Sequence, residues 1–311
     1  MKAVETNGLR GAQRFEVAAW GTRGTLPATG SEFSEYGGAT CCVELRLDDR
    51  VLVLDAGSGL VGLGRNLVQR DIRSIDLLIS HAHLDHVMGL PFFEPLFRPD
   101  WKVTLWFAGV EGAPDPQALI DTLISPPTLP FTRAAFACDL DLRQLPREGE
   151  ADMDGPFRVL TAPLNHPGGN TGFRVEHANR SFAYCCDYEP DGGSSDETLQ
   201  TFIECANLAF LDSTYTPEES SQYRGFGHAD WLSSCQIARR AGLGALGLFH
   251  HAPERQDVAL RAMETAASAL LPSHAVRQGK HLDLMTTDFA AGLEMAQPGQ
   301  QTPRSAVSLF C

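Results

Sequence analysis

The seven residues SHAHLDH, at positions 80–86, directly follow an apolar run that is typical of a buried β-strand. In an extended backbone His81 and His83 lie on one side, Asp85 follows at the same spacing, and His86 joins them from the turn. Four nitrogen and oxygen donors within six residues would leave unpaired polar groups in a core. They suit a divalent metal ion, and the lack of cysteine in the motif argues against a closed structural zinc site.

Strand-like and helical patterns extend from this motif in both directions. Strand-like runs are at 15–21, 41–47, 51–57, 76–81 and 103–109, then at 157–164, 172–176, 181–186, 208–212 and 245–249. Helical patterns are at 59–69, 116–124, 196–205, 230–241 and 255–271. Because strands precede helices in each half, we expect an α/β (α+β) fold of two similar β-rich halves packed face to face, with helices outside. We expect one domain over 1–285 and a partly flexible C-terminal tail over 286–311.

The charge balance limits the partners of this chain. Its 311 residues include 25 basic and 39 acidic side chains, which give a net charge of −14. Proteins that bind long nucleic acids depend on basic side chains to neutralise phosphates, and anionic membranes attract basic segments, so neither partner is expected. A small anionic substrate remains compatible, because a metal ion reverses the local field. With no apolar signal core and no run of about 18 apolar residues, we expect a cytoplasmic protein.

The eight cysteines do not form a CxxC pair, so neither a zinc ribbon nor a thioredoxin-like motif is expected. Two adjacent pairs, Cys41-Cys42 and Cys185-Cys186, lie within strand-like runs. We expect buried, reduced thiols at these positions.

Several motifs in a fixed order resemble those of the metallo-β-lactamase-fold hydrolases, over residues 15–285. The matching segments are LVLDAGSGL at 52–60, HAHLDHVMGLPFF at 81–93, LNHPGGNTGFRV at 164–175, YCCDYEP at 184–190 and LFHHAPER at 248–255. GTRGTLP at 21–27 and YGGATCCVEL at 36–45 are similar to the opening of one branch. That branch contains the ribonucleases Z, the phosphonate-pathway cyclic phosphodiesterase and cyclic-nucleotide phosphodiesterases. The resemblance implies a four-layer αββα sandwich.

The resemblance also implies a dinuclear metal site. One metal ion would be held by His81, His83 and His166, the other by Asp85, His86 and one histidine of the pair His250-His251, and Asp187 would bridge the two. Alignment with the strand-end histidine of the family favours His250, while His251 remains the alternative. The two divalent ions would be Zn²⁺, with Mn²⁺ or Fe as alternatives for these donors. Asp55 would orient a ligand or a loop rather than bind metal.

The segment GFGHADWLSSCQIARRAG at 225–242 resembles the histidine loop and helix of the phosphodiesterase branch. His228 would be the general acid or an electrophilic contact for the phosphate, and Asp212 would orient it. Asp230 has a simpler role, as the cap of the helix that starts at Trp231.

Four further residues match no motif clearly. His177, His274 and His281 are expected at the surface. Arg23, in the glycine-containing stretch 21–30, could contact a substrate phosphate, although a plain turn is the simpler interpretation.

The implied function is hydrolysis of a small phosphodiester, such as a cyclic nucleotide or a cyclic phosphate. Two metal ions that share a water lower its pKa, so that a bridging hydroxide is present near neutral pH. Ribonuclease Z activity is disfavoured by the acidic charge and by the lack of a basic arm rich in glycine and proline. Hydrolysis of a lactone, thioester or other carbonyl ester is one alternative, and a low-turnover ligand-binding or regulatory protein is another. Because similar proteins are often dimers, a homodimer is also expected.

Overall fold

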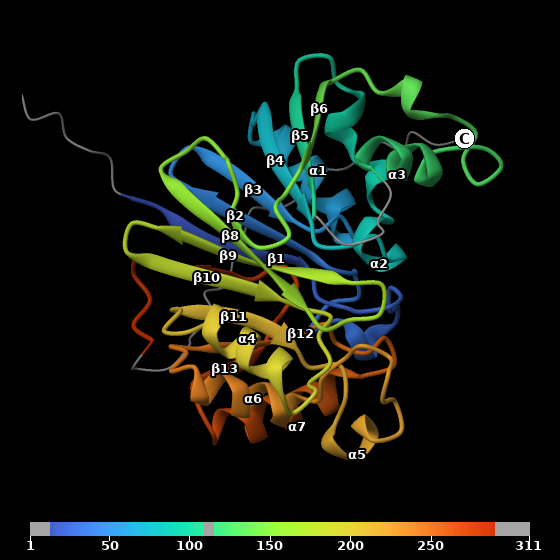
Figure 1. Cartoon of the computed structure of the whole chain (residues 1–311). Helices are drawn as coiled ribbons and strands as arrows, with labels where there is room; N and C mark the ends of the chain where they lie inside the picture. Colours follow the sequence, from blue (N-terminus) through green and yellow to red (C-terminus); the bar gives the residue numbers. More distant parts are fainter. Residues whose placement is uncertain (1–12, 109–114, 290–311) are drawn as a thin grey trace, which may run out of the picture.

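The computed structural model describes residues 13–108 and 115–289, in which two β-sheets lie face to face (Figure 1). The first sheet contains β1 (Phe15–Gly21), β2 (Cys42–Leu47), β3 (Arg50–Leu54), β4 (Ser74–Ile79), β5 (Lys102–Phe107), β6 (Asp139–Gln144) and β14 (His281–Asp283). The second contains β7 (Gly149–Glu150), β8 (Phe157–Leu164), β9 (Asn170–His177), β10 (Arg180–Cys185), β11 (Leu208–Asp212), β12 (Leu246–Phe249) and β13 (Ser273–Ala275). The strand orders are β14-β1-β2-β3-β4-β5-β6 and β13-β12-β11-β10-β9-β8-β7.

Helices cover the outer faces of both sheets. The α-helices of the described residues are α1 (Gly59–Gln69), α2 (Leu84–Val87), α3 (Pro116–Leu123), α4 (Ser194–Phe202), α5 (Pro217–Ser220), α6 (Trp231–Arg240) and α7 (Asp257–Ser268). Figure 1 shows α4, α6 and α7 along the outer side of the second sheet. The predicted four-layer αββα sandwich with two similar halves is confirmed. Among the helices of the described residues, none has the length and apolar character needed to cross a membrane.

The strands are apolar on both sides because each sheet is covered on both faces. In β3, Leu52 and Leu54 pack into the core between the sheets, whereas Val51 and Val53 pack into the outer core that contains Leu60 of α1. A third core joins the second sheet to α4, α6 and α7. Three apolar cores thus correspond to the three interfaces between four layers.

Alternation along the strands also separates the adjacent cysteines. Cys41 and Cys186 lie in the core between the sheets, while Cys42 and Cys185 lie in the two outer cores. All four are buried and free of disulfide bonds, as the sequence predicts.

Four short or exposed strands, β6, β7, β13 and β14, are not predicted from the sequence. Strand β14 pairs antiparallel with β1, with Val17 opposite Leu282, so that the chain returns from the second half to complete the first sheet. A strand of three residues, such as β14, is too short to show a periodic apolar pattern. Phe289 packs against the core between the sheets, four residues beyond the predicted domain boundary. The remainder of the predicted tail, 290–311, lies outside the described residues.

Two of the three histidines expected at the surface are buried, and for them the prediction was wrong. His177 is 4% exposed and His274 is 3% exposed, whereas His281 is half-buried. The Nδ1–H of His177 donates to the carbonyl of Pro156 over 3.0 Å. His274 packs edge-on against Phe210, and neither of its ring nitrogens has a hydrogen-bond partner among the described residues. Each lies on a strand whose covering layer is set by distant parts of the chain.

Replacement of His274 by leucine is expected to reduce the loss of stability at acidic pH. Burial lowers the pKa of His274 from 6.5 to about 4, so the unfolded chain binds a proton that the folded protein excludes between these values. The free energy of unfolding therefore falls as the pH drops from 6.5 towards 4, by about 1.4 kcal/mol per pH unit from this group. Urea unfolding at pH 7.5 and pH 5 measures the change in both proteins. Equal losses in the wild type and in His274→Leu would contradict the prediction.

Candidate metal centre

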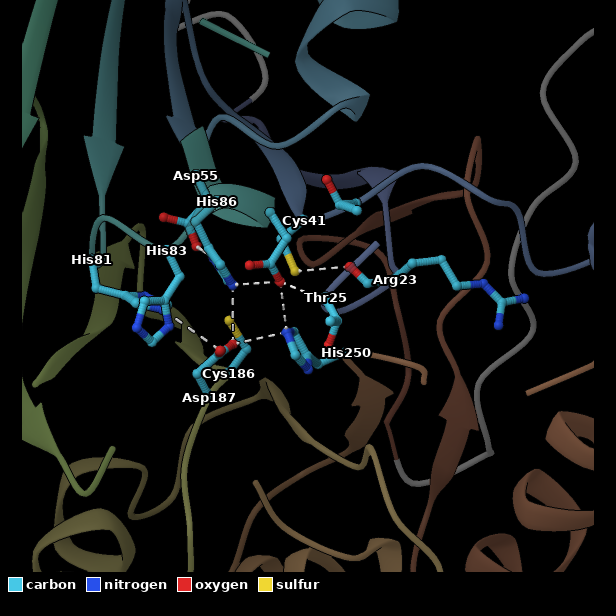
Figure 2. A network of polar contacts seen from close by, with 12 residues as sticks. Arg23, Thr25, Cys41, Asp55, His81, His83, His86, Cys186, Asp187 and His250 are labelled. Atoms are coloured by element: carbon cyan, nitrogen blue, oxygen red, sulfur yellow. Dashed lines mark hydrogen bonds and ion pairs between the residues drawn. The ribbon is translucent and has the colours of Figure 1, made fainter. Parts of the chain in front are cut away.

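The predicted site residues gather at one edge of the two sheets. Asp55 follows β3, His81 and His83 follow β4, His166 follows β8, Asp187 follows β10, Asp212 ends β11 and His250 follows β12. Strands β3 and β4 are parallel, as are β10, β11 and β12, so their carboxyl ends share an edge. Such an edge is where open α/β sheets bind ligands. Figure 2 shows His81, His83, His86, Asp187 and His250 turned towards a common centre.

The first group of donor atoms comes from His81, His83, His166 and Asp187, all within 4.8 Å of one another. Nε2 of His166 lies 3.0 Å from Nδ1 of His83. Oδ2 of Asp187 lies 3.6 Å from Nε2 of His81 and 3.7 Å from Nε2 of His166. The Nδ1–H of His166 donates to the carbonyl of Gly227 over 2.9 Å, which leaves the lone pair of Nε2 directed at this group.

The second group comes from Asp85, His86, Asp187 and His250. Oδ2 of Asp85 lies 3.3 Å from Nε2 of His86 and 3.2 Å from Nε2 of His250. Oδ1 of Asp187 lies 3.2 Å from Nε2 of His86 and 3.1 Å from Nε2 of His250. Asp187 therefore presents one carboxylate oxygen to each group.

Several buried donor atoms of the two groups have no hydrogen-bond partner among the described residues. Nε2 of His81, Nε2 of His86 and Oδ1 of Asp187 are buried and make no hydrogen bond within the described residues. Buried polar atoms are otherwise nearly always paired, and each such exception needs an explanation. Divalent ions within the two groups would supply the missing partner, with nitrogen and oxygen donors of the kind that zinc prefers.

Protonation also fits a cationic occupant. Burial lowers the pKa of all three histidines of the first group, which keeps the imidazoles in the neutral, metal-binding form. In the second group burial opposes protonation of His86 and His250, but the negative charge of Asp187 raises the pKa of both, to about 10 for His250. The carboxylates of this group therefore create a strong local preference for positive charge.

Three site residues adopt a left-handed backbone that non-glycine residues rarely take. The φ angles are 60° at Asp55 and 60° at His250, each directly after a strand, and 55° at Asp187, two residues after β10 ends. Such a conformation costs of the order of 1–3 kcal/mol per residue and persists where the surroundings over-determine it. Strain at three converging strand ends is typical of a functional site.

Asp55 is hydrogen-bonded to Nδ1 of His86, the ring nitrogen that does not face the donor group. This contact is compatible with the orienting role proposed for Asp55. Its Oδ2 accepts from Nδ1 of His86 over 2.7 Å and from the hydroxyl of Tyr184 over 2.8 Å. Ser80 donates to the same carboxylate through its amide over 2.8 Å and its hydroxyl over 2.9 Å. Tyr184 is missing from the sequence prediction. Its spacing of two residues from Cys186 was the available signal, because extended residues two apart lie on the same face, and both pack in the core between the sheets.

His228 lies beside both groups and is oriented by Asp212. The Nδ1–H of His228 donates to Oδ2 of Asp212 over 2.8 Å. The ring of His228 stacks on that of His250 with 4.7 Å between centroids, and lies 5.4 Å from that of His166. Asp212 is buried and also accepts from the amide and hydroxyl of Thr214. The structure thus brings together the two residues that the sequence paired, and their catalytic role is a proposal taken up below.

Three neighbouring predictions can be compared with their positions. His251 points away from the cluster: its Nε2–H donates to the carbonyl of Val276 over 2.9 Å. Arg23 is fully buried and donates to three backbone carbonyls, and Figure 2 shows its guanidinium directed away from the cluster. Its burial and direction argue against a contact between Arg23 and a substrate phosphate. Asp230 caps α6, as predicted, by accepting from the amides of Leu232 and Ser233.

Two cysteines lie behind the second group, which the sequence did not indicate. The sulfur atoms of Cys41 and Cys186 lie within 4.8 Å of each other and of a ring nitrogen of His86. Burial raises the pKa of the Cys186 thiol well above its ordinary value. Cys41 and Cys186 also pack in the apolar core between the sheets, directly behind the second group.

Comparisons with known proteins agree with this architecture. The family described as "Beta-lactamase superfamily domain" matches residues 50–251. Ribonuclease Z of Porphyromonas gingivalis is 23% identical over 321 residues, covering 87% of this chain and 99% of the relative. The metallo-β-lactamase fold protein YhfI from Bacillus subtilis has a TM-score of 0.65 at 18% identity, covering 87% of this chain and 99% of its own.

A diphosphatase from the PhnP family is a further structural neighbour, with a TM-score of 0.61 at 15% identity, covering 86% of this chain and 97% of its own. Likeness at these identities establishes the fold alone, whereas the family match covers well over half of the chain. This chain therefore belongs to the β-lactamase superfamily, as a metal-dependent hydrolase with the metallo-β-lactamase fold.

Proposed function

We infer that this protein hydrolyses small phosphodiesters, such as cyclic nucleotides or cyclic phosphates, at a dinuclear metal site. The observation that carries this proposal is the His228–Asp212 pair, held at 2.8 Å beside two groups of metal donors. When a phosphodiester is hydrolysed, its leaving group departs as an alkoxide that needs a proton. An oriented histidine is suited to supply that proton.

The residues of the chain divide the work between them. His81, His83 and His166 would hold one divalent ion, Asp85, His86 and His250 the other, and Asp187 both. When bound, the ions supply positive charge for the phosphoryl oxygens and a water of lowered pKa. Asp212 accepts a hydrogen bond from the Nδ1–H of His228, so that Nε2 is the nitrogen that gives a proton to the leaving oxygen.

The net charge of the chain favours a small substrate. Ribonuclease Z relatives act on RNA, but a net charge of −14 opposes binding of a long polyanion. A small phosphodiester avoids most of this repulsion, because two divalent ions dominate the field within the site. Zn²⁺ is the expected metal, while a cytoplasmic location and a homodimer stay predictions.

One experiment separates the candidate activities. Purified protein is analysed for metal content and assayed with bis(p-nitrophenyl) phosphate, 2′,3′- and 3′,5′-cyclic nucleotides, a lactone, a thioester and a precursor tRNA. We expect about two metal ions per chain and turnover of the small phosphodiesters above all other substrates. Faster turnover of the lactone or thioester would replace the proposal with carbonyl-ester hydrolysis, and preference for the tRNA would refute the small substrate. Turnover of none of them would favour a ligand-binding role.

A further inference from the structure

A row of aromatic rings leads from His228 to the protein surface. Tyr215 lies edge-on to His228 with 6.0 Å between ring centroids. Tyr223 stacks on Tyr215 at 4.8 Å with an interplanar angle of 10°, and Phe226 lies edge-on to Tyr223 at 5.8 Å. We call Tyr215, Tyr223 and Phe226 the aromatic row.

Exposure rises along the aromatic row with distance from His228. Tyr215 is 9% exposed, Tyr223 is 41% exposed and Phe226 is 62% exposed. Phe226 is the most exposed aromatic side chain in the described part of the chain. Two neighbouring aromatic rings left in water beside a proposed active site offer apolar area that a ligand can cover.

The backbone holds Phe226 in a fixed place. Gly225 and Gly227, on either side of it, have φ angles of 86° and 88°, and both amides donate to the carboxylate of Glu189, over 2.7 and 2.8 Å. The backbone amide of Glu189 donates to the carbonyl of Asn165, next to His166. The row is therefore tied to the strand-end loops that carry the metal donors.

Tyr215 is fixed in the same way. Its amide donates to the carbonyl of Ala229, and its carbonyl accepts from the amide of Trp231. The backbone of Tyr215 is therefore hydrogen-bonded to two residues of the segment that follows His228. A surface that is ordered before the ligand arrives loses little conformational entropy on binding.

We propose that the aromatic row is a subsite that stacks with the nucleobase of a nucleotide phosphodiester. This subsite rests on the proposed function, because the proposed function places the phosphorus atom of the substrate at the metal donors. Gly227 connects the two: its carbonyl accepts from the proposed ligand His166 over 2.9 Å, and Phe226 is the adjacent residue. Every base has a flat π face, so exposed Tyr and Phe rings select for a base without reading its identity.

Two esters with the same leaving group test the subsite: the p-nitrophenyl ester of thymidine 5′-phosphate and ethyl p-nitrophenyl phosphate. The wild type is expected to cleave the thymidine ester with a kcat/KM about tenfold or more above that of the ethyl ester. Phe226→Ala should lose this preference and keep its rate on the ethyl ester. Phe226→Leu, which retains an apolar side chain without a ring, should behave like Phe226→Ala. Val258→Ala, which removes an exposed apolar side chain on α7, should change neither rate.

The outcomes separate this subsite from the catalytic assignment. Equal efficiency with both esters, or an equal loss of both in Phe226→Ala, would overturn the subsite while leaving phosphodiester hydrolysis intact. Hydrolysis of neither ester would overturn the proposed function, and calorimetry with metal-loaded protein then decides the subsite. Thymidine 5′-phosphate should bind the wild type about tenfold tighter than ethyl phosphate does, and this difference should vanish in Phe226→Ala. Equal affinities in the wild type would overturn the subsite there as well.

Discussion

Replacement of Asp187 by asparagine is expected to lower kcat on phosphodiesters at least about 100-fold and to reduce the metal content below two ions per chain. An amide keeps the size of the side chain but has one oxygen, no charge and an NH₂ group that would face one set of donors. Loss of groups that only orient metal ligands costs about 10–100-fold, and loss of a carboxylate shared by both groups should exceed that. Asp187 is also the residue whose charge most strongly favours a cation at His250.

Metal analysis by mass spectrometry and steady-state kinetics measure both effects. A third readout is the thermal midpoint: added Zn²⁺ should raise that of the wild type, because the ion binds the folded state, and should raise that of Asp187→Asn much less. Asp49→Asn, in the exposed turn between β2 and β3, is the matched control and should behave like the wild type. Two bound ions and an unchanged kcat in Asp187→Asn would refute the bridging assignment.

Replacement of His228 by alanine is expected to reduce hydrolysis of a 2′,3′-cyclic nucleotide by about 10³-fold, with metal content unchanged. General acid catalysis contributes about 10²–10⁴-fold where the leaving group needs a proton. p-Nitrophenolate leaves without one, so bis(p-nitrophenyl) phosphate should lose much less activity. The contrast between the two substrates identifies proton donation and excludes a merely structural effect.

Asp212→Asn should show the same contrast with a smaller loss, because the amide oxygen can still accept from Nδ1 of His228 but the amide carries no negative charge. His281→Ala serves as the histidine control, because His281 lies in β14, the edge strand of the first sheet that pairs with β1. Equal losses on both substrates in His228→Ala would contradict the role of general acid. Loss of bound metal in His228→Ala would contradict that role as well.

Much of the metal centre follows from local sequence patterns. A strand of apolar residues places whatever follows it at a sheet edge, so the donors of SHAHLDH after β4 were predictable from that segment alone, whereas His166 after β8 and Asp187 after β10 were implied by the resemblance to the superfamily. That resemblance depended on the order of several motifs along the chain. Strands such as β6 and β14 were not predictable, because they are short or half-exposed and depend on a neighbouring strand for their pairing.

Other features depend on contacts between segments far apart in the sequence. Adjacent histidines at 250 and 251 are chemically identical, and only the packed molecule shows that His250 meets Asp85 while His251 meets Val276. Burial of His274 likewise depends on the layer that covers β13.

The sequence alone was sufficient to establish the donor types of the SHAHLDH segment and their place at a strand end, because both are properties of a single segment, and the order of the other motifs implied the remaining donors. The packed molecule was needed to show how Asp187 divides its oxygens, why Tyr184 supports Asp55, and where Phe226 stands relative to His228. These relations join residues dozens to more than a hundred positions apart, or depend on a loop conformation set by Glu189. Their geometry is a product of long-range packing, which no local periodicity records.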